Sequence, residues 1–293
     1  MLELWMFVVT DVNHIEDIFL NTQIMITINN KKIEVNHFPD NTQLLNYQVE
    51  NETEFNINWC YDNDEECMTL WYLVHHIRTK CNHNIKINLD MYYTPNARFD
   101  RVKDDNAVFT LKYFADFINS FNFDKVVVYN VHSNVSEALI DKVINIDPIF
   151  DVDTVISKYK PDVIYFPDEG ACKRYADLAC IKNYDLPVIF GIKKRDFATG
   201  KILGLDVVSD IDLTGKKVLI VDDICSAGGT FKFSAMKLKE LGASDVALYV
   251  SHCEDNIQNG DLLKTDLVSK IYTTDSILHI SDPKIQIIHK FRN

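Results

Sequence analysis

Short apolar runs alternate with amphipathic stretches along most of the chain. Residues 24–28 and 31–35 are two β-rich runs on either side of Asn29-Asn30, a pattern that predicts a hairpin. From residue 64 on, the spacing of apolar residues predicts helices over 64–80, 107–121, 152–158 and 171–181, with another that follows residue 230 and ends near Gly242. Between them it predicts strands over 85–91, 125–130, 163–166, 188–192, 218–221 and 246–250. Such alternation is typical of an α/β protein with parallel sheets whose faces are covered.

The length of the chain, 293 residues, allows one large domain or two of ordinary size. We place a domain boundary at Asp147-Pro148, which predicts an N-terminal domain of residues 1–147 and a C-terminal domain of residues 148–293. Ligands of parallel α/β sheets bind beyond the carboxyl ends of the strands. The segments that follow the predicted strands are therefore where binding chemistry is expected.

Composition excludes several functional classes. Hydrophobic residues make up 47% of the chain and charged residues 25%, as in globular proteins. A net charge of −13 argues against a broad nucleic-acid-binding surface but leaves room for small phosphorylated ligands. No apolar run approaches the ~20 residues that span a bilayer, and the start lacks the basic leader of a signal peptide, so we expect a cytoplasmic protein with no membrane contact. Seven cysteines without a Cys-x-x-Cys pair favour neither a disulfide framework nor a zinc site.

The strongest chemical signal lies at the end of the strand predicted over 218–221. Asp222 and Asp223 follow it, and the chain continues into a small turn made of Ser226, Ala227, Gly228, Gly229 and Thr230. Because this turn leads into a helix, its backbone N–H groups and the helix dipole attract a phosphate. The two carboxylates would repel a phosphate, but they suit neutral hydroxyls or a cation nearby. A sugar phosphate meets both demands.

This stretch resembles the thirteen-residue fingerprint of type I phosphoribosyltransferases and phosphoribosyl diphosphate synthetases. In the first half, residues 92–101 resemble the synthetase segment that ends in Ala-Arg-x-Asp-Arg, and residues 37–42 resemble the flexible loop that meets the adenine of ATP, often across a subunit boundary. Val131-His132-Ser133 stands where that family has a histidine near the ATP phosphates.

Three motifs of the second half add to the resemblance. Residues 166–174 resemble the Pro-Asp-x-Gly turn of the synthetases, Lys193-Lys194-Arg195 falls at their catalytic Lys-x-Arg, and Ser251-His252 resembles their Thr-His. Taken alone, each charged segment also has an ordinary reading as a surface ion pair or a packing histidine. Together the motifs stand in the family's order, which favours the synthetases.

The resemblance implies two similar phosphoribosyltransferase-like domains, each with a mainly parallel sheet flanked by helices. It implies an ATP-dependent diphosphokinase of nucleotide biosynthesis that uses Mg²⁺ and works as a homo-oligomer, a dimer or larger, with the active site near a subunit interface. Its catalytic residues would be Lys193 and Arg195, its ATP-binding residues Phe38, Asp40, Arg98, Phe99, Asp100, Arg101 and His132, its ribose-phosphate-binding residues Asp168, Asp222, Asp223, Ser226, Ala227, Gly228, Gly229 and Thr230, and its metal contacts His132 and Asp168.

Departures from the family pattern leave the acceptor open. The family usually has an acid where Ser226 stands and threonine where Ala227 stands, and a small pair leaves room for a larger acceptor. The acceptor is therefore ribose 5-phosphate, or ADP-ribose in a pathway that rebuilds NAD. Two alternatives use the same fold: a phosphoribosyltransferase that consumes phosphoribosyl diphosphate, and a catalytically inactive nucleotide-binding regulator.

Overall fold

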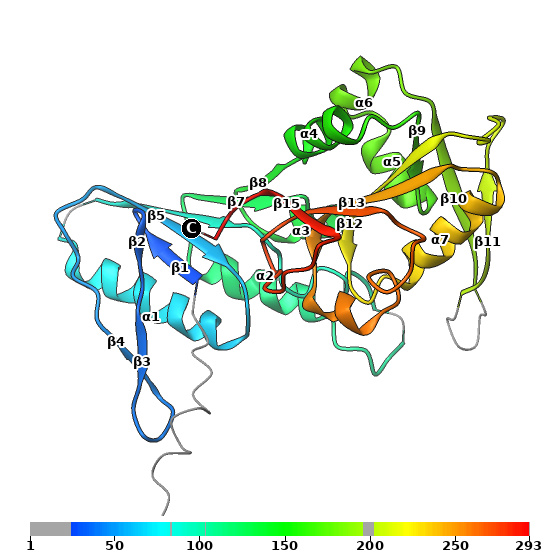
Figure 1. The fold of residues 1–293 in the computed structure, drawn as a ribbon. Coiled ribbons are helices and arrows are strands. Elements are labelled where there is room, and N and C mark those ends of the chain that lie inside the picture. Colours follow the sequence, from blue (N-terminus) through cyan, green and yellow to red (C-terminus); the bar gives the residue numbers. More distant parts are fainter. Residues whose placement is uncertain (1–24, 83, 103, 196–201, 293) are drawn as a thin grey trace, which may run out of the picture.

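The protein is an α/β protein built on two mainly parallel sheets flanked by helices (Figure 1). The computed structural model describes residues 25–292 except 83, 103 and 196–201, and it describes no side chains over 193–205. A six-stranded sheet lies in the first half of the chain and a seven-stranded sheet in the second. The fold class predicted from the sequence is confirmed.

The six-stranded sheet combines an antiparallel start with a parallel remainder. Its strands, in spatial order, are β2 (Lys31–Lys32), β1 (Met25–Ile28), β5 (Glu54–Cys60), β6 (Lys86–Met91), β7 (Lys125–Tyr129) and β8 (Val143–Ile146). Strands β5 to β8 run parallel, whereas β1 pairs antiparallel with β2 and β5. The helices of this half are α1 (Glu65–Lys80), α2 (Thr110–Ser120) and α3 (Asn134–Leu139).

In the described part of the first half, one face of this sheet packs into the hydrophobic core. Alternate residues of a strand point to opposite faces, so Phe55, Ile57 and Trp59 of β5 share a face and are buried with apolar residues of α1 and α2. The opposite face carries amides instead: Asn88 of β6 hydrogen-bonds to Asn56 of β5. Among the described residues, the core of the first half therefore lies on the side of the sheet where α1 and α2 lie in Figure 1.

The seven-stranded sheet is parallel except at one edge. Its strands, in spatial order, are β11 (Ile202–Val208), β10 (Val188–Arg195), β9 (Val163–Phe166), β12 (Lys217–Cys225), β13 (Asp245–Cys253), β14 (Lys270–Thr274) and β15 (Ile285–His289). The antiparallel pair is β10 with β11. The helices are α4 (Ile149–Tyr159), α5 (Glu169–Tyr175), α6 (Ala179–Asn183) and α7 (Gly229–Glu240), with a 3₁₀ helix over Asp255–Asn259.

Both faces of the second sheet are covered. In β12, Val218 and Ile220 pack into a core with α7, whereas Leu219 and Val221 pack into a core with α4, α5 and α6. All four side chains are fully buried. A strand buried on both sides has a continuous apolar sequence, which is why this stretch is the most hydrophobic of the predicted strands.

Most predicted elements are present, with errors at particular places. The hairpin around Asn29-Asn30 forms, and both asparagines have positive φ, as its tight turn requires. The helix predicted over 171–181 is wrong as a single element, because α5 ends at Tyr175 and α6 begins at Ala179. The strands β5, β8, β14 and β15 were not among the predicted ones. Within the described part of the chain, no helix is long and apolar enough to cross a membrane.

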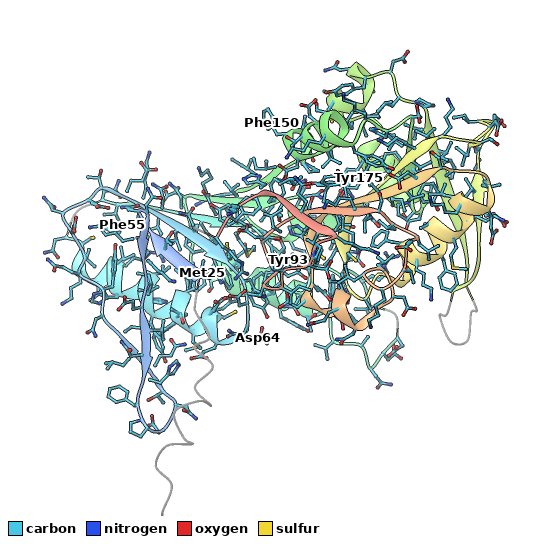
Figure 2. The ribbon with its side chains drawn as sticks, viewed as in Figure 1. Met25, Phe55, Asp64, Tyr93, Phe150 and Tyr175 are labelled. Atoms are coloured by element: carbon cyan, nitrogen blue, oxygen red, sulfur yellow. The ribbon has the colours of Figure 1, made fainter. Side chains whose placement is uncertain are left out.

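A buried polar chain connects the two halves. Asn130, directly after β7, accepts a hydrogen bond from the Tyr175 hydroxyl (2.9 Å) and donates one to the Ser251 hydroxyl (2.6 Å). All three side chains are at most 1% exposed. In Figure 2, Tyr175 lies within the second half and Tyr93 at the junction of the halves. Buried hydrogen bonds of this kind set the two sheets in one orientation.

Removing the amide of Asn130 should therefore lower the stability of the whole protein. We expect Asn130→Ala to reduce the free energy of unfolding by about 1–3 kcal/mol, because two buried hydroxyls lose a partner. Asn122→Ala is the matched control, since Asn122 also has positive φ but is exposed. Urea unfolding curves of both variants measure the difference. Equal losses of unfolding free energy in the two variants would show that backbone strain, and not the buried hydrogen bonds of Asn130, is responsible.

Candidate active site

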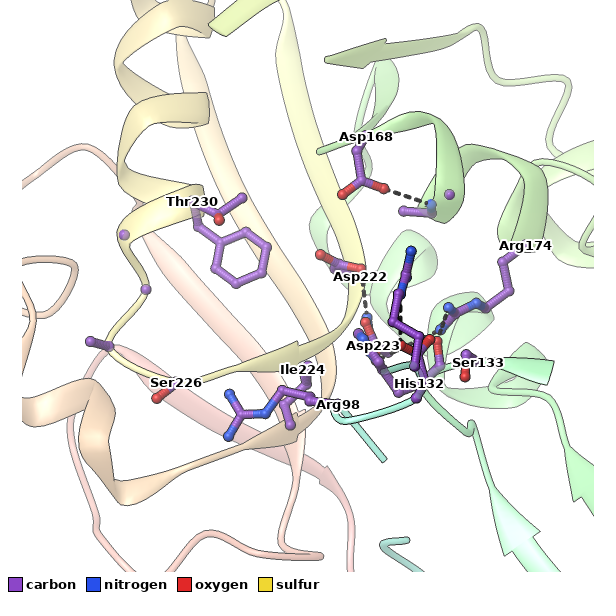
Figure 3. Close-up of a pocket in the computed structure, with 18 residues that line it drawn as sticks. Arg98, His132, Ser133, Asp168, Arg174, Asp222, Asp223, Ile224, Ser226 and Thr230 are labelled. Carbon is purple, nitrogen blue, oxygen red and sulfur yellow. Dashed lines mark hydrogen bonds and ion pairs between the residues drawn. The ribbon is translucent and has the colours of Figure 1, made fainter. Parts of the chain in front are cut away.

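One cavity of about 850 Å³ lies between the two halves, at the carboxyl ends of their strands (Figure 3). The first half contributes residues that follow β6 and β7, and the second half contributes residues from β12 and from the segments after β9 and β12. The side chains and backbone that line it are Arg98, Asp100, Arg101, His132, Ser133, Asp168, Gly170, Ala171, Arg174, Asp222, Asp223, Ile224, Ser226, Ala227, Gly228, Gly229, Thr230 and Phe231.

The two adjacent carboxylates sit at the cavity floor in different electrostatic surroundings. Burial and the neighbouring Asp223 charge raise the pKa of Asp222 well above its usual value. Burial acts on Asp223 in the same direction, but a hydrogen bond from His132 and the charge of Arg174 outweigh it and hold the pKa of Asp223 below its usual value. The backbone N–H of Asp223 donates to Asp222 Oδ1 at 3.0 Å. Asp223 is therefore the carboxylate that is held ionised.

The hydrogen bond between His132 and Asp223 joins the two halves of the chain. His132 Nδ1 lies 2.5 Å from Asp223 Oδ2. An ionised carboxylate can only accept, so Nδ1 carries the proton and donates it. This leaves Nε2 as the imidazole nitrogen that is free to face a ligand.

The glycine-rich turn has the backbone shape expected of an anion-binding loop. Gly228 has φ of +79°, and a Cβ there would lie 2.4 Å from Leu262, so only glycine fits. A Cβ on Gly229 would meet nothing within 4 Å, which shows that this peptide faces open space. Helix α7 begins at Gly229, so the first free N–H groups of the helix open into the cavity.

A second segment supports this turn from behind. Asn256 donates to the Ser226 hydroxyl at 2.8 Å. Gly260 packs backbone to backbone against the turn, since a Cβ at Gly260 would lie 1.8 Å from the carbonyl oxygen of Ala227. The turn is therefore supported by a segment that lies about 30 residues further along the chain.

Basic residues of the first half form the opposite wall. Arg98 pairs with Glu254 of the second half, and Arg101 donates to Asp100 at 3.0 Å. Burial alone would raise the pKa of Asp100. The hydrogen bond and the charge of Arg101 outweigh burial and hold the pKa of Asp100 below its usual value. Arg98 and Arg101 are 48% and 74% exposed, so both guanidinium groups are accessible to an anionic ligand.

Asp168 lies across the cavity from these arginines. It caps helix α5, where its Oδ1 accepts from the backbone N–H of Ala171 at 2.9 Å. Its charge also acts on Asp222. Among the described residues, no group of three or more His, Cys, Asp or Glu side chains is placed to hold a metal ion by itself. The donor set fits Mg²⁺ that is held mainly by ligand phosphates and water, with few protein oxygens.

The structure brings together most, but not all, of the predicted site residues. Phe38, Asp40 and Phe99 do not line the cavity. Phe38 and Asp40 lie in the turn between β3 (Val35–His37) and β4 (Gln43–Leu45), a hairpin that projects away from the rest of the molecule in Figure 1. The Asp40 carboxylate accepts from Thr42 N–H and hydroxyl there, and Phe38 is 49% exposed.

The predicted catalytic pair lies in β10. The backbone of Lys193 pairs with Leu205 and that of Arg195 with Ile202, across the hairpin with β11. The side chains of Lys193 and Arg195 lie outside the described part of the structure. Their catalytic role therefore stays a prediction.

Sequence reasoning assigned no role to several residues at this site. Arg174 and Ser133 line the cavity, and Glu254, Asn256 and Gly260 act from just behind it. Arg174 and Ser133 lie inside motifs that the sequence had already marked. Nothing local marks the other three, because their contacts are with residues 30 or more positions away.

His252 is a buried histidine beneath the cavity. Its Nε2 faces the carbonyl oxygen of Tyr129 at 3.1 Å and its Nδ1 faces the Ser276 hydroxyl at 2.8 Å. Tyr93 packs against the ring edge to face, with centroids 5.2 Å apart. Because a carbonyl only accepts, Nε2 carries the proton. Burial lowers the pKa of His252 to about 4, so the ring is neutral near pH 7.

Comparisons with known proteins agree with this geometry. Residues 152–287 match the family described as the phosphoribosyl transferase domain. A ribose-phosphate pyrophosphokinase of Hyphomonas neptunium is 28% identical over 191 residues, and one of Vibrio parahaemolyticus is 27% identical over 192 residues. Each match covers 63% of this chain and 59% of the relative, so the chain matches about three fifths of the length of these relatives.

The fold of most of the chain has a solved counterpart. The phosphoribosylpyrophosphate synthetase of Mycobacterium smegmatis superimposes with a TM-score of 0.69 at 17% identity, covering 89% of this chain and 86% of that one. The fold and the cavity thus define a protein of the type I phosphoribosyltransferase fold. Within that fold class, the chain is similar in sequence to ribose-phosphate pyrophosphokinases over 63% of its length.

The buried His252 should make stability depend on pH. Its folded-state pKa of about 4 lies below the ordinary value of 6.5, so between these pH values the unfolded chain takes up a proton that the folded protein does not. The free energy of unfolding should therefore fall as pH falls, by roughly 2 kcal/mol between pH 7 and pH 5 from this residue. His252→Gln removes this term.

Urea unfolding of the native protein and of His252→Gln at both pH values measures the difference. The difference in the free energy of unfolding between the two proteins should be smaller at pH 5 than at pH 7, because only the native protein loses the contribution of His252. An equal difference in the free energy of unfolding at both pH values contradicts the assignment of a buried neutral His252.

Proposed function

We propose that the protein is an ATP-dependent diphosphokinase that transfers the β,γ-diphosphate of ATP to the anomeric hydroxyl of a ribose 5-phosphate moiety and releases AMP. The observation that carries this proposal is the shared cavity. Its second-half wall has two carboxylates and an anion-binding turn, and its first-half wall has two accessible arginines and a histidine. A phosphoribosyltransferase would use the former wall as well, and the arginine wall from the other half of the chain supports a reaction with a second, polyphosphate substrate.

The acceptor would lie on the second-half wall. Its phosphate would occupy the turn over residues 226–230, where free N–H groups and two hydroxyls can donate to it. Its ribose hydroxyls would donate to Asp223, which is held ionised, and bond to Asp222 beside it. Such contacts orient the anomeric hydroxyl toward the opposite wall.

The phosphates of ATP would lie on the first-half wall. Arg98 and Arg101 would bind them, because a guanidinium offers paired donors to phosphate oxygens. His132 would face them with Nε2, since its Nδ1 is engaged by Asp223. Bound Mg²⁺, held by phosphate oxygens with Asp168 and His132 near it, would neutralise phosphate charge.

Lys193 and Arg195 would supply positive charge to the diphosphate as it moves. Phosphoryl-type transfers depend mainly on positioning and on charge neutralisation, so cations at the moving group contribute most of the rate. In β10 both residues lie beyond Phe190, which pairs with Phe166 at the end of β9, and Asp168 follows the end of β9.

The size of the acceptor depends on the surroundings of Ser226. This hydroxyl is neutral and is held by the amide of Asn256, so Ser226 itself adds no negative charge that would repel a second phosphate. ADP-ribose, which carries a diphosphate where ribose 5-phosphate carries a monophosphate, is therefore proposed beside ribose 5-phosphate. The exposed hairpin that carries Phe38 would complete the adenine site of a neighbouring subunit in a cytoplasmic homo-oligomer.

The proposed reaction is tested by measuring AMP release from Mg-ATP with ribose 5-phosphate and with ADP-ribose. We expect acceptor-dependent AMP release with at least one of the two. AMP release with ADP-ribose alone would indicate that the neutral surroundings of Ser226 determine which acceptor is used. ATP binding with no AMP from either acceptor would contradict the proposal and favour a nucleotide-binding regulator.

Lys193→Ala should lower turnover on the order of 10²-fold or more, because one cation at the transferred group is lost. Its sequence neighbour Lys194→Ala is the control and should stay within a few-fold of the native protein. Steady-state AMP release with the active acceptor measures both. A Lys193→Ala enzyme with near-native turnover would remove this residue from the catalytic step.

A further inference from the structure

Arg174 is a cavity residue to which neither the motifs nor the comparisons give a task. It lies in α5, in the second half, and its side chain is 26% exposed. Its guanidinium donates to the carbonyl oxygen of Val131 at 3.1 Å and to that of His132, and it lies 3.7 Å from Asp223 Oδ2. One side chain of the second half thus holds backbone of the first half (Figure 3).

The carbonyls that Arg174 binds belong to the segment that carries His132. This segment leaves the sheet after β7 ends at Tyr129, so its carbonyls need partners outside the strand ladder. A guanidinium has donors in a rigid plane and can serve two carbonyls and a carboxylate at once. The position of His132 relative to Asp223 is therefore set from two directions, by their own hydrogen bond and by Arg174.

Neighbouring contacts fix Arg174 itself. Its Nη1 lies 3.4 Å from the hydroxyl of Tyr175, and that hydroxyl donates to Asn130. Tyr175 is fully buried. A partly buried cation is retained at such a site only with full pairing, and here every partner lies at the junction of the two halves.

We propose that Arg174 is a positioning residue that fixes the first-half wall of the cavity, where ATP would bind, relative to the second-half wall, where the acceptor would bind. The inference rests on the proposed diphosphate transfer, in which Asp222 and Asp223 hold the ribose hydroxyls that orient the acceptor, while the ATP phosphates lie near Arg98 and His132. Arg174 binds neither substrate in this account. It sets the distance between them, and distance errors of about 1 Å cost on the order of 10²-fold in rate.

Two substitutions separate its charge from its geometry. Arg174→Lys keeps a positive charge near Asp223 but lacks the planar fork that serves two carbonyls together. Arg174→Met keeps comparable length and loses both. Lys173→Met is the matched control, because Lys173 is the neighbouring cation, is 74% exposed and pairs only with Glu169 at 2.8 Å among the ion pairs described.

The kinetic test measures kcat and KM for ATP and for the acceptor in AMP release. We expect Arg174→Met to lower kcat on the order of 10²-fold while both KM values stay within about threefold, because each substrate keeps its own wall. Arg174→Lys should fall between, and Lys173→Met should match the native protein. Near-native kcat in Arg174→Met overturns the proposal. So does a rise in KM that accounts for the whole loss of kcat/KM.

A second readout does not require activity. The imidazole signals of His132 in NMR spectra should move in Arg174→Met and stay in place in Lys173→Met, whereas unmoved signals in both overturn the proposal. If the native protein releases no AMP with either acceptor, the proposed function fails, and the NMR result still decides whether Arg174 positions His132. If Arg174→Met does not fold, Arg174→Lys carries the test: a loss in kcat of tenfold or more supports the proposal, and native kcat overturns it.

Discussion

The carboxylate of Asp223 is a point at which the two halves of this protein meet inside the candidate active site. It is buried, it accepts a hydrogen bond from His132 of the first half, and Arg174 of the second half lies beside it. A buried negative charge is tolerated only with such partners. The same pairing that stabilises the charge also brings the end of β7 to the end of β12. The cavity exists because those two strand ends are held together there.

That arrangement also divides two chemically identical side chains into different roles. Asp222 and Asp223 are adjacent in β12, yet burial raises the pKa of the first while its partners lower the pKa of the second. The ionised carboxylate of Asp223 can accept a hydrogen bond from one hydroxyl of a sugar. The carboxyl group of Asp222, whose pKa is raised, can bind a neighbouring hydroxyl of the same sugar. The anion-binding turn begins three residues later, and the arginines that suit a polyphosphate face it across the cavity. The acceptor and donor walls thus come from different halves of the chain, and the His132–Asp223 hydrogen bond is one of the contacts that join them.

The parts of this account that the sequence predicted are those with local causes. The turn over residues 226–230 was recognisable because glycine, a small hydroxyl and a helix start are all local signals, and the structure places them as expected. The alternation of strand and helix was readable for the same reason. The helix over 171–181 was predicted as continuous, since nothing in its apolar spacing marks the break between α5 and α6.

What the sequence did not reveal depends on contacts made across the fold. Glu254 pairs with Arg98, which is 156 positions away, and Gly260 is required only because the Ala227 carbonyl happens to lie against it. Arg174 stood within a recognised motif, but its partners at Val131 and His132 become visible only when the two halves are docked. The strands β14 and β15, five residues each, were also missed; β14 is buried except for Lys270, and β15 is half-buried. Long-range packing, not local propensity, determines each of these.

The most direct test of the central claim follows the phosphates of ATP. Mg-ATP labelled at either the α- or the γ-phosphate is incubated with the acceptor, and the products are separated. If both walls of the cavity act together as described, the γ label moves into the sugar product and the α label is recovered in AMP, which shows that the β,γ-diphosphate is transferred as one unit. Recovery of the α label in ADP, with only the γ-phosphate on the sugar, would show a simple kinase reaction and contradict the account.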